Sequence, residues 1–154
     1  GARTLAEMRV LVGALRDSDD PALLAPRTAA DIASLARTTG HPAVQVVLAG
    51  DVDGLHPSVG AALYRIAQES VTNATRHAVG ASAVRIDLDV AADVAHLRVE
   101  DDGEPVAVER ERRGYGIVGM SERVSLLGGT LTAGPGSERG WVVEARVPTT
   151  GVRR

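Results

Sequence analysis

Three polar side chains interrupt an otherwise helix-forming stretch at residues 63–77. Glu69, Asn73 and His77 are four residues apart, so one stripe of a helix would carry all three. A carboxylate and a carboxamide one turn apart offer a proton acceptor and an oxygen ligand for a hard cation such as Mg²⁺. The simpler alternative is a solvated helix face, on which His77 favourably places charge near the helix C-terminus.

A single aspartate ends an alternating stretch further along the chain. Asp101 falls on the same face as Leu97 and Val99, where a further apolar residue is expected. A carboxylate on that face needs a hydrogen-bond donor, because an unpaired buried charge is costly. An exocyclic amine such as that of adenine would serve. The alternative is that Asp101 merely begins a turn with residues 102–103.

Glycines recur at Gly114, Gly116 and Gly119, ahead of a helix-forming stretch. Glycines that lead into a helix allow backbone N–H groups to approach phosphates at the positive end of the helix dipole. A glycine series alone is weak evidence and usually marks only a loop. The carboxamide, the aspartate and the glycines together predict a nucleotide site.

The composition sets outer limits on the protein. The 154 residues are enough for one domain with a hydrophobic core plus a short appendage, and the core must be aliphatic because aromatic residues make up 2% and Phe is absent. A net charge of −3 gives no global basic field for nucleic acid or an anionic membrane. The absence of cysteine excludes disulfides and thiolate metal sites, and no apolar run approaches the ~18 residues of a membrane span. The start at Gly1 predicts a piece of a longer protein.

The hydrophobic pattern predicts the order of elements. Residues 2–16 form a helix whose apolar spacing fits either a coiled-coil seam or packing on its own domain, and residues 17–21 are the expected boundary. A helix over 28–39 follows, with a Thr28–Asp31 capping box and a stop at Gly40.

The remaining elements alternate between sheet and helix. We expect a buried strand at 43–49, a helix at 58–77, a hairpin of strands 84–90 and 94–99, a mobile loop at 102–115, a helix at 117–127, and strands at 130–133 and 141–147. This order predicts an α+β fold with helices on one face of a mixed, mostly antiparallel sheet.

At three places the sequence resembles one family. Residues 65–74 resemble the N box, residues 99–103 the first glycine box and residues 114–123 the second glycine box of two-component sensor histidine kinases of the DesK-like type. Residues 5–16 are similar to the end of the second dimerisation helix. The resemblance to the catalytic ATP-binding domain covers nearly the whole chain.

The resemblance implies a GHKL (Bergerat) fold, a two-layer α/β sandwich. Residues 1–20 would be the end of the dimerisation helix with a linker, 21–150 the ATP-binding catalytic domain and 151–154 a tail. The implied reaction is transfer of the γ-phosphoryl group of Mg²⁺-bound ATP to a histidine on a dimerisation domain. The parent would be a homodimer, anchored in the membrane with this domain in the cytoplasm, and would pass the phosphoryl group to a response regulator.

The resemblance also implies residue roles. Asn73 would bind Mg²⁺, Glu69 would act on the acceptor histidine as polar partner or general base, Asp101 would accept from the adenine amine, and Gly103 would let the backbone close on the base. Residues 104–115 would form a lid over ATP. The other residues implied in ATP binding are His77, Gly114, Tyr115, Gly116, Ile117, Val118, Gly119 and Met120.

Two positions depart from the family pattern. Pro105 replaces a glycine and stiffens the start of the lid, and Trp141 replaces a threonine whose hydroxyl helps to hold adenine through water. Trp141 therefore predicts a rearranged base pocket.

The acceptor histidine is also missing. In the family that the sequence resembles, an acidic residue follows the phosphorylated histidine. None of the four histidines here precedes an acidic residue, so we expect no autophosphorylation of this chain alone. Two alternatives remain open: an anti-sigma-factor-like serine kinase of the same fold, which the second glycine box argues against, and a non-catalytic nucleotide-binding or docking module.

Overall fold

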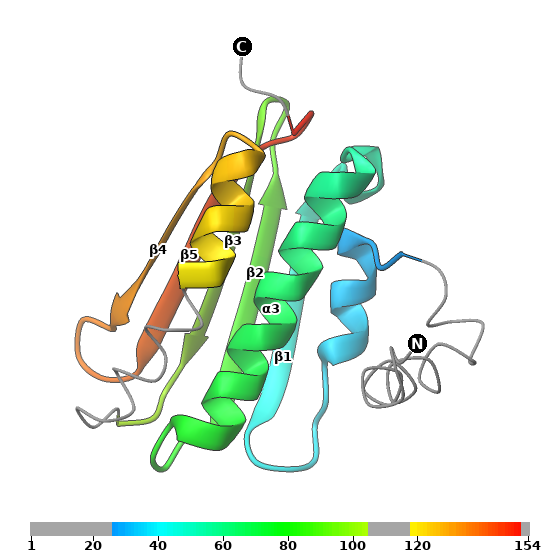
Figure 1. The fold of residues 1–154 in the computed structure, drawn as a ribbon. Coiled ribbons are helices and arrows are strands. Elements are labelled where there is room, and N and C mark those ends of the chain that lie inside the picture. Colours follow the sequence, from blue (N-terminus) through cyan, green and yellow to red (C-terminus); the bar gives the residue numbers. More distant parts are fainter. Residues whose placement is uncertain (1–25, 105–117, 152–154) are drawn as a thin grey trace, which may run out of the picture.

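A computed structural model describes residues 26–104 and 118–151, which form two layers (Figure 1). One layer is a sheet of five strands: β1 (Ala43–Gly50), β2 (Ala83–Val90), β3 (Val94–Asp101), β4 (Thr130–Pro135) and β5 (Trp141–Pro148). The other layer lies on one face of the sheet and holds η1 (Ala29–Leu35), α3 (Pro57–His77) and a helix at residues 118–126. The short turn η2 (Val52–Gly54) precedes α3. The predicted α+β sandwich is confirmed.

The strands lie in the order β1-β2-β3-β5-β4. Only β1 and β2 are parallel, and every other neighbouring pair is antiparallel. A parallel pair needs a crossover connection, which α3 provides as it returns the chain over the sheet. In the antiparallel part, Asp101 of β3 pairs in register with Trp141 of β5. The predicted mixed, mostly antiparallel sheet is therefore confirmed.

The sequence of α3 explains both where the helix begins and which face it buries. The Nδ1 atom of His56 accepts a hydrogen bond from the Ser58 N–H at 3.1 Å, and Pro57 occupies the first turn, where its missing N–H costs nothing. The residues buried against the sheet recur every three or four positions, as on one face of an α-helix. The residues with this spacing are Val59, Leu63, Ile66, Ser70 and Ala74, and the buried residues beside them on the helix are Ala62, Tyr64, Ala67 and Val71.

The central strands alternate, as their sequence pattern predicts. In β3 every second residue is buried under the helices, and the residues between them are half-exposed. The opposite face of the sheet is polar, with an Arg98–Glu100 ion pair at 2.7 Å and a His96–Glu144 hydrogen bond at 2.8 Å. One face of the sheet therefore forms the aliphatic core and the other meets solvent.

The helix predicted over 28–39 is wrong in length and type. The structure has a 3-10 helix of seven residues, η1, which ends before Ala36 adopts an extended conformation. Arg37 then pairs with Val44, with N···O distances of 3.0 and 2.9 Å in the two directions, and this bridge holds the chain against β1. The predicted start is correct, since the Thr28 N–H donates to the Asp31 carboxylate at 2.7 Å.

The strand predicted at 43–49 exists, but it is not fully buried. β1 is the edge strand next to β2, and Val44 is its only residue in the buried class. Val46 and Leu48 pack partly against the core, whereas Val47 is exposed. An apolar run reports strand propensity, but it does not reveal whether neighbouring elements cover both faces.

The second half of the chain follows its prediction closely. Residues 118–126 are helical, and the helix ends where the Gly129 N–H bonds the Val124 carbonyl at 3.0 Å, just after the predicted glycine pair begins. β4 then pairs with β5 as an antiparallel hairpin and forms one edge of the sheet.

Several predictions lie outside the described residues. These are the helix at 2–16, the boundary at 17–21, most of the loop at 102–115, and the tail at 151–154 apart from residue 151. The proposed domain limits stay predictions.

Gly140 fixes the approach of β5 to the end of β3. Its φ is +85°, and a Cβ atom at this position would lie 1.9 Å from the Asp101 carbonyl oxygen. Only glycine combines this backbone conformation with so close a contact.

We expect Gly140→Ala to lower the free energy of unfolding by about 1–3 kcal/mol, because it adds backbone strain and a clash at the β3–β5 corner. Urea denaturation followed by circular dichroism measures this change. The matched control is Gly134→Ala in the neighbouring strand, where an added Cβ meets nothing within 4 Å. Equal stability of the two variants would contradict the proposed constraint.

Candidate functional site

A small cavity lies between the second half of α3 and the ends of three strands. Its volume is about 10 Å³, which is room for about one water molecule. α3 contributes three lining residues, and β2, β3 and β5 contribute the others. The lining residues are Ser70, Asn73, Ala74, Val84, Val99, Asp101, Trp141 and Val143.

Among the described residues that line this cavity, Asp101 is the only charged one. It is 6% exposed and lies on the core face of β3, as its alternation with Leu97 and Val99 predicts. Its Oδ1 atom accepts a hydrogen bond from the Gly103 N–H at 2.9 Å. Asp101 therefore lies on the core face, as predicted, and its side chain also accepts from the backbone two residues on, as at the start of a turn.

The polar stripe of α3 divides in the structure. Asn73 is half-buried and lines the cavity, whereas Glu69, one turn earlier, is exposed and does not line it. The side chain of His77 lies outside the described part of the structure. Of the two stripe residues whose side chains are described, only Asn73 lines the cavity with Asp101.

Asp102 anchors the end of β3 to the start of β2. Its Oδ1 atom accepts from the Ser82 N–H at 2.7 Å and from the Ala83 N–H at 3.1 Å, and its Oδ2 atom accepts from the Ser82 hydroxyl. Burial opposes ionisation of this carboxyl, but the hydrogen bonds together outweigh burial and lower the pKa of Asp102.

Gly103 packs tightly against the α3–β2 connection. A Cβ atom at Gly103 would lie 2.9 Å from the Ala78 Cβ and 3.0 Å from the Val79 carbonyl oxygen. The next residue, Glu104, donates its N–H to the same Val79 carbonyl at 2.8 Å. Close packing therefore favours glycine at position 103, in addition to the role that the family resemblance implies.

The predicted phosphate-binding glycines lie at the edge of the described residues. Gly114, Tyr115, Gly116 and Ile117 fall outside them. Val118 and Gly119 are exposed at the start of the helical residues 118–126. Met120 is 9% exposed and belongs to the core cluster, so its side chain packs inward.

The sequence reasoning missed Ser70 as a site residue. Ser70 lies between Ile66 and Ala74 at helical spacing, on the face that α3 buries, and this spacing is a signal that could have identified it. Trp141 had been noted as a departure from the family pattern, and the structure places it in the cavity wall at 9% exposure.

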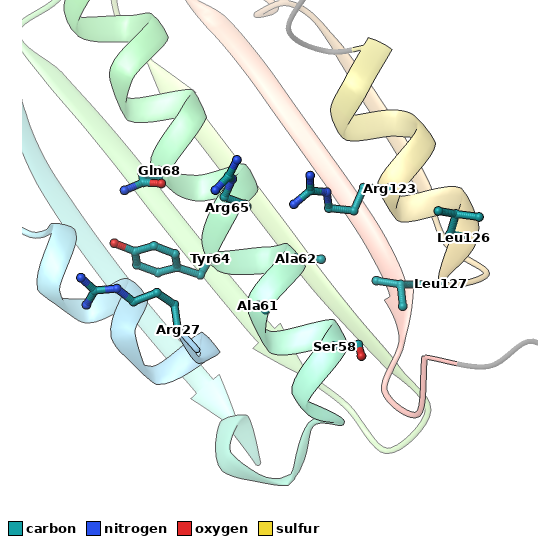
Figure 2. Close-up of a pocket in the computed structure, with 10 residues that line it drawn as sticks. All are labelled: Arg27, Ser58, Ala61, Ala62, Tyr64, Arg65, Gln68, Arg123, Leu126 and Leu127. Carbon is teal, nitrogen blue, oxygen red and sulfur yellow. The ribbon is translucent and has the colours of Figure 1, made fainter. Parts of the chain in front are cut away.

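A larger groove of about 500 Å³ lies elsewhere, between α3 and the helix at 118–126 (Figure 2). Figure 2 shows three guanidinium side chains along it, from Arg27 ahead of η1, Arg65 on α3 and Arg123 on the neighbouring helix. Arg27 stacks over the Tyr64 ring at 5.5 Å from the centroid. None of the predicted site residues that the structure describes lines this groove, so its size alone does not mark the site. We take the cavity that holds the buried carboxylate as the candidate site.

The fold and the cavity define a class of protein: a two-layer α+β domain whose covering helix and strand ends enclose a small cavity with a buried carboxylate. Residues 58–151 match the family described as histidine kinase-, DNA gyrase B-, and HSP90-like ATPase. The match covers more than half of the chain, and the chain belongs to this ATPase family.

Curated relatives narrow this assignment. The chain is 33% identical to the histidine-protein kinase/phosphatase DegS of Bacillus subtilis over 98 residues, which is 61% of this chain and 25% of DegS. It is 40% identical to UhpB of Salmonella typhimurium over 82 residues, or 53% of this chain and 16% of UhpB. It is 32% identical to the sensor histidine kinase LnrJ of Bacillus subtilis over 145 residues, or 92% of this chain and 34% of LnrJ.

The chain thus spans about a third or less of the length of these relatives. A solved structure shares the fold: the nucleotide-free catalytic domain of histidine kinase ThkA, with a TM-score of 0.50 and 16% identity over 70% of this chain and 80% of that one. The identification as an ATP-binding catalytic domain of the sensor histidine kinase type is confirmed. Among the described residues, no helix is both long and apolar enough to cross a bilayer.

Asp102 provides a test of the corner beside the cavity. We expect Asp102→Ala to lower the free energy of unfolding by about 1–2 kcal/mol at neutral pH, because it leaves the Ser82 and Ala83 N–H groups without their acceptor. Because the pKa of Asp102 is lowered in the folded state, its contribution to the free energy of unfolding is complete above the ordinary pKa of 3.8. The contribution is lost as the pH falls through the folded-state pKa.

Urea denaturation at pH 7 and at pH 3 measures both effects. The difference between the wild type and Asp102→Ala should shrink at the lower pH. Asp93→Ala, in the exposed β2–β3 turn, is the control. A difference that stays constant between the two pH values would contradict the assignment.

Proposed function

We propose that this domain binds ATP with Mg²⁺ at the cavity and transfers the γ-phosphoryl group to a histidine of a dimerisation domain in the parent protein. The observation that carries the proposal is the buried Asp101 carboxylate beside the half-buried Asn73 amide, in a chain of the ATPase family. Asp101 would accept a hydrogen bond from the adenine amine. The low-dielectric surroundings of a buried carboxylate strengthen such a bond.

The donor set around Asn73 is suited to Mg²⁺ rather than to a metal held entirely by protein. Among the described residues there is no group of three or more His, Asp and Glu side chains that could hold a metal ion. Mg²⁺ commonly takes one or two protein oxygens and completes its octahedron with waters and substrate phosphates. Asn73 would supply the protein oxygen, and the bound metal would neutralise phosphate charge.

The exposure of Glu69 supports a role for this residue that differs from the role proposed for Asn73. Glu69 is exposed, one turn before Asn73, and so it can reach a histidine presented from outside this domain. Two of the four histidines have structural contacts here: His56 caps α3 and His96 pairs with Glu144. The acceptor would therefore lie on the dimerisation domain, and the response regulator would be the next recipient.

A second candidate function follows from the size of the cavity. At about 10 Å³ the cavity is too small for a purine, which must lie over its mouth or displace Trp141. If no base can enter, the domain is a docking module that keeps the fold without catalysis. Phosphotransfer from ATP to an added dimerisation domain would exclude this candidate.

We expect Asn73→Ala to weaken binding of Mg²⁺-ATP by at least about 10- to 100-fold, the scale seen for groups that support a metal site. The loss should be much smaller for ATP without Mg²⁺. Isothermal titration calorimetry with and without Mg²⁺ measures both. Gln68→Ala removes an exposed carboxamide from the same helix and serves as the control. An unchanged affinity in Asn73→Ala would refute the metal-ligand role.

We expect Asp101→Asn to weaken ATP by about tenfold or more while leaving GTP binding almost unchanged. The carboxamide oxygen can still accept from the Gly103 N–H, but an NH₂ donor replaces one acceptor oxygen and opposes the adenine amine. Competition binding with the two nucleotides measures the effect, with Asp93→Asn as control. Equal losses for ATP and GTP would contradict the adenine contact.

A further inference from the structure

The hydroxyl group of Ser70 is buried without a hydrogen-bond partner among the described residues. Its Oγ atom is fully enclosed, and the residue is 6% exposed. Ser70 lies on the face of α3 that otherwise buries apolar side chains such as Ile66 and Ala74. A buried hydroxyl without a partner costs folding free energy, so its position calls for a polar partner that binds there.

The cavity next to Ser70 has the size and the lining that suit one water molecule. Its volume of about 10 Å³ is at the lower limit for a bound water. Ser70, Asn73 and Asp101 bring a hydroxyl, an amide and a carboxylate to its wall, and a buried water needs two to four such partners. Three of the eight lining residues are polar, so the cavity is not a purely apolar void.

Ser70 is the only hydroxyl residue among the described residues that line this cavity. On the opposite side Trp141 of β5 contributes a large, mostly carbon surface and pairs in register with Asp101. A hydroxyl contact to anything bound beside Asp101 can therefore come from α3 but not from β5.

We propose that Ser70 is a specificity-determining residue of the base pocket, acting through one water behind the base. The inference rests on the proposed function. The edge of adenine presents an amine donor beside a ring-nitrogen acceptor, N1. Asp101 can only accept, so it matches the amine, whereas a water held by Ser70 can donate to N1. Ser70 and Asp101 together complement adenine and oppose guanine, whose edge has the reversed order.

The test compares Ser70→Ala with the wild type in calorimetric titrations of ATP and of 1-deaza-ATP, which lacks the N1 acceptor. The wild type should bind ATP about five- to tenfold more tightly than the analogue, the scale of one hydrogen bond. In Ser70→Ala the affinity for ATP should fall by the same factor and the preference over 1-deaza-ATP should vanish. Ser58→Ala, an exposed serine in the first turn of α3, should keep the preference.

Thermal unfolding without nucleotide separates this role from a structural one. Ser70→Ala removes the enclosed hydroxyl, so its melting temperature should equal or exceed that of the wild type while its ATP affinity falls. A merely structural serine would lower the melting temperature and weaken ATP and 1-deaza-ATP alike, and this result would overturn the inference. A preserved ATP preference in Ser70→Ala would also overturn it.

The titrations also distinguish a failure of the proposed function from a failure of the role proposed for Ser70. If wild type binds neither nucleotide at millimolar concentration, both are refuted. If wild type binds ATP and Ser70→Ala binds it equally well, only the role of Ser70 is refuted.

Discussion

The parallel pairing of β1 with β2 is the constraint on which the rest of the structure depends. Two adjacent parallel strands cannot be joined by a hairpin, so the chain must cross the sheet between them, and α3 is that crossing. The crossing places the second half of α3 above the end of β3 and the start of β5. An amide and a hydroxyl from the helix thereby come to lie beside a carboxylate from the sheet, although they stand about thirty residues apart along the chain.

The corner at the end of β3 concentrates different tasks in three consecutive residues. Asp101 turns toward the cavity, Asp102 fastens the neighbouring strand through the Ser82 and Ala83 N–H groups, and Gly103 packs beneath the α3–β2 connection. Because Asp102 bonds the start of β2 and Gly103 packs against the α3–β2 connection, the Asp101 carboxylate is positioned by the two residues that follow it, neither of which lines the cavity. The proposed binding role of Asp101 and the stabilising contacts of its neighbours are thus adjacent in sequence but rest on separate side chains.

The sequence predicted the fold best where one regular pattern dominates. Alternation in β3 placed Asp101 on the core face, whereas the helical stripe of α3 did not reveal that Asn73, and not Glu69, lines the cavity with it. The helix at 28–39 was predicted too long because the Arg37–Val44 bridge is a tertiary contact that no local pattern reveals. The helical spacing of Ser70 could have placed it on the buried face, but no local pattern shows that its hydroxyl lacks a hydrogen-bond partner there.

The position of Trp141 has an optical consequence. It is the only tryptophan of the chain, and it forms part of the cavity wall with Asp101 and Asn73. Indole emission excited at its own absorption band therefore originates from a single place in the molecule, and that place is the candidate site. Trp141 is therefore an intrinsic fluorophore, and its emission wavelength and intensity report on the polarity of this pocket. No label is needed, and no other tryptophan contributes to the signal.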